Sequence, residues 1–372
     1  MTISNNATTD TVEFPPELPI AQLHTIDLGR LQAGDEDEAQ RLLDASRKDG
    51  VFYLNLASAQ KEIVPVLDSI YELSNGLFSL PLEEKCRYDV DRLGKMKCNG
   101  YKPLGRNFGG LEGKRDGFET YVIPKNGILS LDNQRDFPRP PLIDHYMNTL
   151  QQFTTFVNTT SQTIFDKLSH SLELPETGNL KLLHRPSAPS PDIIRLLKYH
   201  PQPAEQRGVP HAAHTDMGTL TFLFTRQPGL QIQNPGEEIW RWVLPREGHA
   251  IVNLGDGLSL LTNGYLQSCV HRVGPLPGRA MPTRYSFAYM VRPENQTVMT
   301  APQTGCIPAR DPDATVLTAQ EWLEKKYSVL RLDARPDDLI SFQDAGEDSE
   351  IGGSLVAFSL ISRETLCMLY LR

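Results

Sequence analysis

His214, Asp216 and His271 have the side chains and the spacing of a metal site. One residue separates His214 from Asp216 in HTDMGTLTFLF, and His271 follows in SCVHRVG. Residues two apart on a β-strand point to the same face, so the first pair can project together from one strand end. Two imidazoles and one carboxylate suit Fe(II) and leave three coordination positions open, although the same donors also bind zinc, manganese or cobalt. We therefore predict a metal site with room for substrate-derived ligands and O₂.

The pair His214 and Asp216 alone is weak evidence, because both residue types are also common in exposed turns. His200 and His211 lie nearby in the sequence and compete for the role of ligand. The segments that surround the triad decide in favour of the metal interpretation.

Arg284 and Ser286 form a second constellation, thirteen residues after His271, in the segment RYSFAYMV. On a strand they share a face, so a guanidinium and a hydroxyl can bind one carboxylate together. An isolated Arg-x-Ser is commonplace on protein surfaces. Its place in a strand just after the third candidate ligand favours a carboxylate site.

The composition limits the classes of partner. The chain has 372 residues, is 39% hydrophobic and carries a net charge of −9, which argues against binding to nucleic acid. No apolar run approaches the roughly 20 residues that cross a bilayer. The N-terminus lacks the features of a secretory signal, and the five cysteines form no CxxC pair. We expect a cytoplasmic protein that acts on a small molecule, without membrane or nucleic-acid partners; the sequence does not predict the oligomeric state.

Apolar residues at helical spacing predict helices over 35–48, about 60–79 and about 142–172. Thr318 and Glu321 match a capping box ahead of a last helix. The β-branched and aromatic run at 50–56 predicts a strand.

The segment 95–133 is rich in glycine and charge, and we expect loops and short strands outside the core there. From Ile193 onward, short apolar or alternating runs are separated by turn residues at intervals of about 8–12, typical of an antiparallel sandwich or jelly roll. The predicted fold class is mixed α/β (α+β), with a jelly-roll core and an N-terminal helical region packed on it. The predicted parts are an arm over 1–18, a helical and mixed region over 19–180, the core over 181–335, and a segment without clear signal over 336–372.

The sequence resembles the isopenicillin N synthase-like family of Fe(II)/2-oxoglutarate-dependent dioxygenases. The matching segments are HTDMGTLTFLF, PGLQIQ, IVNLGDGLSLLTNG, SCVHRV and RYSFAYMVRP, and fainter agreement extends over about 18–330. The resemblance implies a double-stranded β-helix with Fe(II) at its open end, held by His214, Asp216 and His271 as the catalytic ligands. It implies that Arg284 and Ser286 hold the distal carboxylate of 2-oxoglutarate.

Tyr199 aligns with a family tyrosine that also contacts the cosubstrate. The family often has asparagine two residues earlier, where this chain has Leu197. We expect the corresponding hydrogen bond to be missing or to come from another residue.

The implied reaction oxidises a substrate C–H bond, by hydroxylation, desaturation or ring rearrangement, with 2-oxoglutarate and O₂ as cosubstrates and ascorbate as a reductant. Relatives commonly act in secondary metabolism, which makes such a small molecule the expected substrate. Two alternatives stay open: an Fe(II) oxidase of the same family that does not use 2-oxoglutarate, and a non-catalytic small-molecule-binding barrel.

The substrate contacts are the least defined part of the site. Four aromatic residues are candidates for lining the pocket, although aromatic residues on strands are more often core. They are Phe118, Tyr121, Phe224 and Phe287. Asp116 and Glu119 are either a loop-fixing pair or polar contacts to the substrate.

Overall fold

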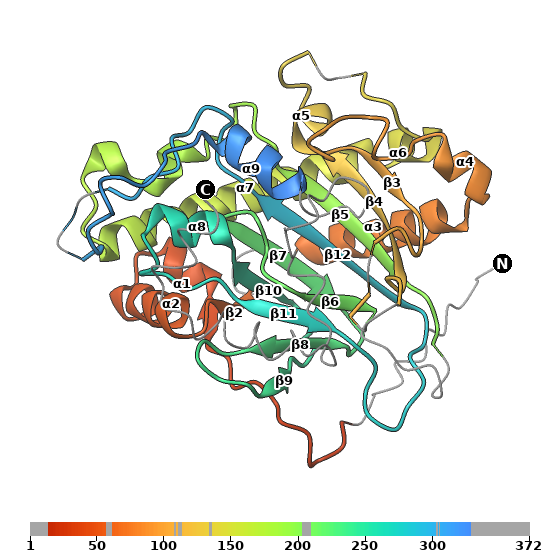
Figure 1. The fold of residues 1–372 in the computed structure, drawn as a ribbon, viewed down its shortest axis with the longest axis horizontal. Helices are drawn as coiled ribbons and strands as arrows, with labels where there is room; N and C mark the ends of the chain where they lie inside the picture. The colour runs from red at the N-terminus through yellow and green to blue at the C-terminus, as the bar shows by residue number, and fades with distance from the viewer. Residues whose placement is uncertain are drawn as a thin grey trace.

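The computed structural model describes residues 14–56, 62–107, 109–110, 114–133, 136–202, 210–302, 304 and 306–328. Within these ranges the chain forms two β-sheets and a set of helices that cover the outer face of the larger sheet (Figure 1). The expectations for the ends of the chain, 1–13 and 336–372, fall outside the described residues.

The larger sheet has eight strands, and all of its pairings are antiparallel except that of β1 with β2. Its order is β1 (Thr25–Asp27), β2 (Val51–Asn55), β10 (His249–Leu254), β7 (Leu220–Thr225), β12 (Arg284–Val291), β5 (Ile193–Tyr199), β4 (Phe118–Pro124) and β3 (Gly100–Lys102).

The smaller sheet has four strands and carries two of the predicted metal ligands. Its order is β6 (His211–His214), β11 (Val270–Val273), β8 (Leu230–Gln233) and β9 (Trp240–Trp242). Side chains of both sheets meet in one buried apolar cluster, which includes Leu197 and Ile251 of the larger sheet and Leu230 and Ile232 of the smaller sheet. Two sheets that enclose a shared interior are the predicted jelly roll, and the prediction of the fold class is confirmed.

The helices lie mainly before the core strands in the sequence. They are α1 (Leu28–Gln32), α2 (Glu36–Lys48), α3 (Ile63–Ser79), α4 (Leu82–Cys86), α5 (Lys125–Ile128), α6 (Pro141–His145), α7 (Met147–Ser171), α8 (Asp256–Leu261) and α9 (Ala319–Ser328), with short 3₁₀ helices at Glu176–Gly178 and Leu180–Leu183. No helix in the described ranges has the length and apolar character needed to span a membrane.

Side-chain caps fix the starts of two helices. The Asp35 side chain accepts a hydrogen bond from the Glu38 backbone N–H at 3.0 Å and begins α2. At α9, the backbone N–H of Thr318 donates to the Glu321 carboxylate at 2.8 Å, and the Glu321 N–H donates back to the Thr318 hydroxyl at 3.3 Å. This reciprocal pair is the capping box expected there.

Helix α7 packs on the outer face of the larger sheet and so determines which strand residues face inward. Phe153 of α7 lies 5.6 Å from Phe224 of β7 and 5.6 Å from Phe287 of β12, measured between ring centroids. Because side chains alternate along a strand, Arg284 and Ser286 of β12 point to the opposite face, toward the smaller sheet. The long helix predicted over about 142–172 is interrupted at Tyr146, which separates α6 from α7.

One expectation about the core was wrong. The segment 95–133 contributes strand β4, in which all seven residues are buried, and β4 pairs along its whole length with β5. The glycines and charges that flank β4 in the sequence masked its apolar residues. Because β1 to β4 all precede residue 180, the predicted N-terminal region and the predicted core share the larger sheet.

Candidate metal centre

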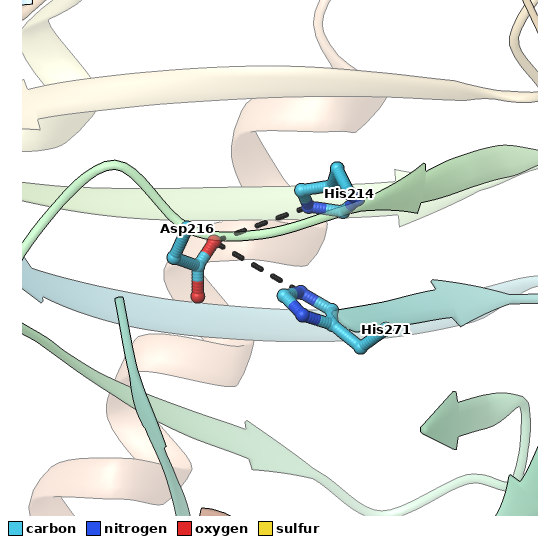
Figure 2. A group of neighbouring side chains, drawn as sticks. All are labelled: His214, Asp216 and His271. Carbon is cyan, nitrogen blue, oxygen red and sulfur yellow. Dashed lines mark ion pairs between the residues drawn. The ribbon is translucent and has the colours of Figure 1, made fainter. Parts of the chain in front are cut away.

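The three predicted ligands lie together at one end of the interior between the sheets. His214 ends β6, Asp216 follows in the next loop, and His271 lies opposite His214 in the register of β6 and β11. The Nε2 atoms of His214 and His271 each lie 3.9 Å from Asp216 Oδ1 (Figure 2). One donor atom from each side chain lies within 4.8 Å of the other two. The strand pairing thus converts two distant motifs into one cluster of donors.

Hydrogen bonds to the backbone fix the orientation of both imidazoles. His214 Nδ1 lies 2.8 Å from the carbonyl oxygen of Ala212, and His271 Nδ1 lies 3.1 Å from that of Cys269. A carbonyl oxygen only accepts, so Nδ1 carries the proton and donates it. Each Nε2 therefore presents its lone pair toward Asp216, the arrangement in which histidine binds a metal.

The loop that carries Asp216 is held by close contact with the segment before α8. The Asp256 N–H donates to the carbonyl oxygen of Asp216 at 2.8 Å. A Cβ atom on Gly255 would lie 2.6 Å from that same oxygen and 2.3 Å from the carbonyl oxygen of Gly218. Only glycine permits this approach, which explains the glycine at the start of the GDG segment.

Burial keeps the His214 imidazole in the form that binds metal. Desolvation, reinforced by the neighbouring His271, lowers the pKa of His214 to about 3, so its ring is neutral at physiological pH. For Asp216, burial alone raises the pKa, but the two adjacent histidines outweigh it and hold the pKa below its ordinary value. The cluster offers two imidazole nitrogens and one carboxylate.

The donor set, two histidines and one carboxylate, is one that suits Fe(II). Asp216 is 4% exposed, and its Oδ2 atom has no hydrogen-bond partner among the described residues. A buried carboxylate oxygen without a partner is costly unless a cation or water satisfies it. Oδ1 of the same carboxylate lies 3.9 Å from both Nε2 atoms, so this oxygen and the two Nε2 lone pairs are the three groups that one metal ion would satisfy together.

The two competing histidines are engaged elsewhere. His211 Nδ1 lies 3.1 Å from the Tyr199 hydroxyl, and its ring stacks on His214 with 4.3 Å between centroids. His200 Nε2 lies 3.0 Å from a carboxylate oxygen of Glu119. Neither belongs to the cluster of donor atoms found among the described residues.

Arg284 lies on the inner face of the larger sheet, and part of its guanidinium is already hydrogen-bonded within the protein. It donates to the Pro228 carbonyl oxygen at 3.1 Å, to the Ser286 hydroxyl at 3.2 Å and to the Thr225 hydroxyl at 2.9 Å. A guanidinium has five N–H groups, so two remain for a ligand. Arg284 is 1% exposed, and its positive charge has no carboxylate partner in the described part of the chain.

One cavity contains all six predicted metal and cosubstrate residues. It has about 430 Å³ of empty space, part of it open to solvent, and is lined by the triad, Tyr199, Arg284 and Ser286. Leu197, at the position where the family often has asparagine, also lines it. The remaining lining residues include Arg195, Thr221, Leu223 and Asn253.

Three of the four aromatic candidates for substrate contact face away from this cavity. Tyr121, Phe224 and Phe287 belong to the core beneath the helices, and the expectation that they line the pocket was wrong. Strand alternation explains the error: Phe287 follows the inward Ser286 and therefore points outward. Phe118 packs behind the cavity wall, 4.3 Å from the ring of His211 and 5.3 Å from that of Tyr199.

Asp116 and Glu119 each pair with a buried lysine. Asp116 accepts a hydrogen bond from Lys102, and Glu119 accepts one from Lys85 at 2.6 Å. Asp116 also accepts from the backbone N–H of Gly105 at 2.7 Å. Of the two alternatives left by the sequence, this geometry favours the fixing of local structure.

Sequence reasoning missed three polar residues of the cavity. Thr221 and Asn253 are cross-strand neighbours on β7 and β10. The Thr221 hydroxyl and the side-chain amide oxygen of Asn253 are buried without a hydrogen-bond partner among the described residues. Arg195 precedes Tyr199 by four residues on β5. The even spacing from Tyr199 is a signal in the sequence that places Arg195 on the inner face.

Two family models match the chain. The 2OG-Fe(II) oxygenase superfamily matches residues 191–293, and the family described as non-haem dioxygenase in morphine synthesis N-terminal matches residues 23–135. The chain is 31% identical over 320 residues to 2-oxoglutarate-dependent dioxygenase gloE from Glarea lozoyensis, covering 86% of this chain and 91% of that protein. It is 34% identical over 277 residues to 2-oxoglutarate-dependent dioxygenase ecdG from Aspergillus rugulosus, covering 72% of this chain and 80% of that protein.

Solved structures share the fold at lower identity. A full-length Neurospora crassa protein, crystallised in complex with alpha-KG and 5-formyluracil, superposes with a TM-score of 0.67 at 22% identity, over 82% of this chain and 94% of that one. A 2OG-Fe(II) oxygenase family protein from Caulobacter crescentus superposes with a TM-score of 0.68 at 23% identity, over 82% and 98% of the two chains.

Proposed function

The chain belongs to the 2OG-Fe(II) oxygenase superfamily, as the resemblance predicted, and we propose that His214, Asp216 and His271 hold its catalytic iron. The protein is a 2-oxoglutarate-dependent dioxygenase that uses Fe(II), 2-oxoglutarate and O₂. The observation that carries the assignment of the ligands is the convergence of the two Nε2 atoms on Oδ1 of the buried Asp216 carboxylate.

Arg284 is the proposed anchor for the distal carboxylate of 2-oxoglutarate. Its two free N–H groups and its buried charge suit a carboxylate, and the Ser286 hydroxyl lies beside it. Tyr199 is proposed as a wall of the same site, because its ring lies 4.9 Å from the Arg284 guanidinium carbon. Leu197 supplies no hydrogen bond, so the cosubstrate has one polar contact fewer than in relatives with asparagine there.

Bound iron supplies the oxidising chemistry, coupling the oxidative decarboxylation of 2-oxoglutarate by O₂ to oxidation of a substrate C–H bond. The residues of the chain supply position and exclusion of water. The backbone carbonyl oxygens of Ala212 and Cys269 hold the two imidazoles in one tautomer. Leu223, Leu230 and Val273 give the cavity apolar walls.

We propose a small molecule of secondary metabolism as the substrate, oxidised by hydroxylation, desaturation or ring rearrangement. The N-terminal match to a family described from morphine synthesis supports this class. The net charge of −9 supports the further proposal that the protein has no nucleic-acid partner.

We also propose a cytoplasmic location, supported by four described cysteines that are all free thiols. Fractionation of the producing cell would test it.

The experiment that tests the function measures conversion of 2-oxoglutarate to succinate by the iron-loaded enzyme, with a panel of small molecules. Substrate-dependent succinate formation is expected. Turnover of a substrate without consumption of 2-oxoglutarate would instead identify the oxidase alternative within the family.

A further inference from the structure

Arg195 lies at the other end of the cavity from Arg284. In the register of β5 and β12, Tyr199 pairs with Arg284, and Arg195 pairs with Ala288. Four residues along a strand span about 13 Å. Both guanidinium-bearing residues point into the same cavity, so it has a cationic side chain at each end.

Among the described residues, Arg195 has no hydrogen-bond or ion-pair partner that would explain its charge. Its cross-strand neighbours are Val122 and Ala288, neither of which is polar. Its one ring contact in the described structure is with Phe118, whose centroid lies 5.8 Å from the guanidinium carbon. In the described ranges it forms no hydrogen bond and no ion pair, unlike Arg284 with its three hydrogen bonds.

A count of the charges in the cavity leaves Arg195 without an opposite charge. When iron and 2-oxoglutarate are bound, the two positive charges of the metal and the one of Arg284 are matched by Asp216 and by the two carboxylates of the cosubstrate. Arg195 then carries the single unmatched charge. An uncompensated charge in a half-buried site is unfavourable, and a guanidinium without partners is prepared to bind an oxyanion with two parallel hydrogen bonds.

From this geometry we infer that Arg195 binds a carboxylate of the primary substrate. The substrate class is a small acid with one carboxylate and an apolar body, because Leu223, Ala288 and Met290 line the cavity around Arg195. The inference rests on the proposed function, since it assigns Arg284 to 2-oxoglutarate and leaves Arg195 to the substrate.

Calorimetric titration tests the inference on protein loaded with Fe(II) and saturating 2-oxoglutarate, without oxygen so that no turnover occurs. The probes are phenylacetate, 4-phenylbutyrate and 1-naphthylacetate, each compared with its primary amide. We expect at least one acid to bind the wild type about ten-fold or more tightly than its amide, since hydrogen bonds to charged groups contribute at this level. In R195Q the preference for that acid should disappear. Arg41→Gln, on the surface of α2, is the matched control and should keep the preference.

Three results would overturn the inference. They are a preference for acids that survives in R195Q, a series in which no acid binds better than its amide, and an R195Q protein that loses about ten-fold in affinity for 2-oxoglutarate. The last would assign Arg195 to the other carboxylate of the cosubstrate. Failure of the proposed function has a separate signature, because it would appear as unchanged binding of 2-oxoglutarate in Arg284→Gln.

Discussion

Tyr199 and Arg284 lie directly opposite each other in the register of β5 and β12, with the guanidinium carbon 4.9 Å from the centre of the phenol ring. This pairing joins two strands whose inner residues form one wall of the cavity. A cation over an aromatic face is held in place while its remaining N–H groups stay free. The pair therefore supplies a rigid, positively charged end to the site.

Replacement of Arg284 with alanine should weaken binding of 2-oxoglutarate by about a hundred-fold, because a buried charged contact contributes roughly 2–5 kcal/mol. Iron binding should persist, since the triad does not contact Arg284 in the described structure. Calorimetry with 2-oxoglutarate in the absence of oxygen measures the first effect, and the metal content measures the second. Ser286→Ala, which removes a neutral hydroxyl, should cost less than about ten-fold. Unaltered affinity in Arg284→Ala would refute the role of Arg284.

Replacement of His214 or Asp216 with alanine should abolish both iron retention and turnover. Each change removes one of three donors, and the open geometry offers no replacement among the described residues. Metal analysis after dialysis gives the result. His249→Ala is the matched control, because His249 begins β10 outside the cavity, where it contacts the Glu247 carbonyl oxygen and the Tyr53 ring. Equal loss of iron in the control would point to misfolding.

Replacement of Glu119 with glutamine should lower the free energy of unfolding at neutral pH by about 3 kcal/mol, because Lys85 would lose its buried partner. Denaturant unfolding measures the change. Glu83→Gln on α4, where the carboxylate is 90% exposed, is the matched control and should be nearly neutral.

The same carboxylate predicts a defined acid dependence. Burial acts to raise the pKa of Glu119, but hydrogen bonds from His200, Lys85 and Tyr101 outweigh it and hold the pKa at about 2. The folded pKa is below the ordinary value of 4.5, so the stabilisation is complete above that pH and is lost as the pH falls toward about 2. Glu119→Gln should flatten the stability curve in this window. If the free energy of unfolding of Glu119→Gln fell with pH as steeply as that of the wild type, Glu119 would not be the source of the acid dependence.

Replacement of Phe287 with alanine should lower the free energy of unfolding by about 3–5 kcal/mol, as expected for a large cavity in the core. Phe287 is fully buried, with its ring 4.9 Å from Tyr71 and 5.0 Å from Phe224. Affinity for 2-oxoglutarate should stay within about two-fold, because the ring faces the helices. A large loss of 2-oxoglutarate binding in a stably folded variant would show instead that Phe287 lines the pocket.

Much of the site was predictable because its chemistry is carried by fixed spacings. The alternation of a strand places Arg284 with Ser286 on one face, and the spacing of His214 and Asp216 lets one strand end present both. The partner of that pair, His271, comes from a distant segment, and single-sequence patterns do not give the register that brings β11 beside β6.

The inner and outer faces of the buried strands were less predictable. Residues on both faces of β12 and β7 are buried, and aromatic residues occur among them. The alternation of side chains therefore does not show which face packs under the helices and which faces the pocket. Phe224 and Phe287 were misassigned for this reason. Arg195 was overlooked because a sequence alone does not show whether the guanidinium of an arginine in an apolar strand forms a hydrogen bond or an ion pair.

The most direct test of the central claim is a visible absorption spectrum, recorded without oxygen, of the wild type and of Asp216→Ala with Fe(II) and 2-oxoglutarate. We predict a weak charge-transfer band in the wild type that requires both the metal and 2-oxoglutarate and is absent in the variant. A wild-type spectrum without this band, or an equal band in Asp216→Ala, would contradict the assignment of His214, Asp216 and His271 as the ligands of the catalytic iron.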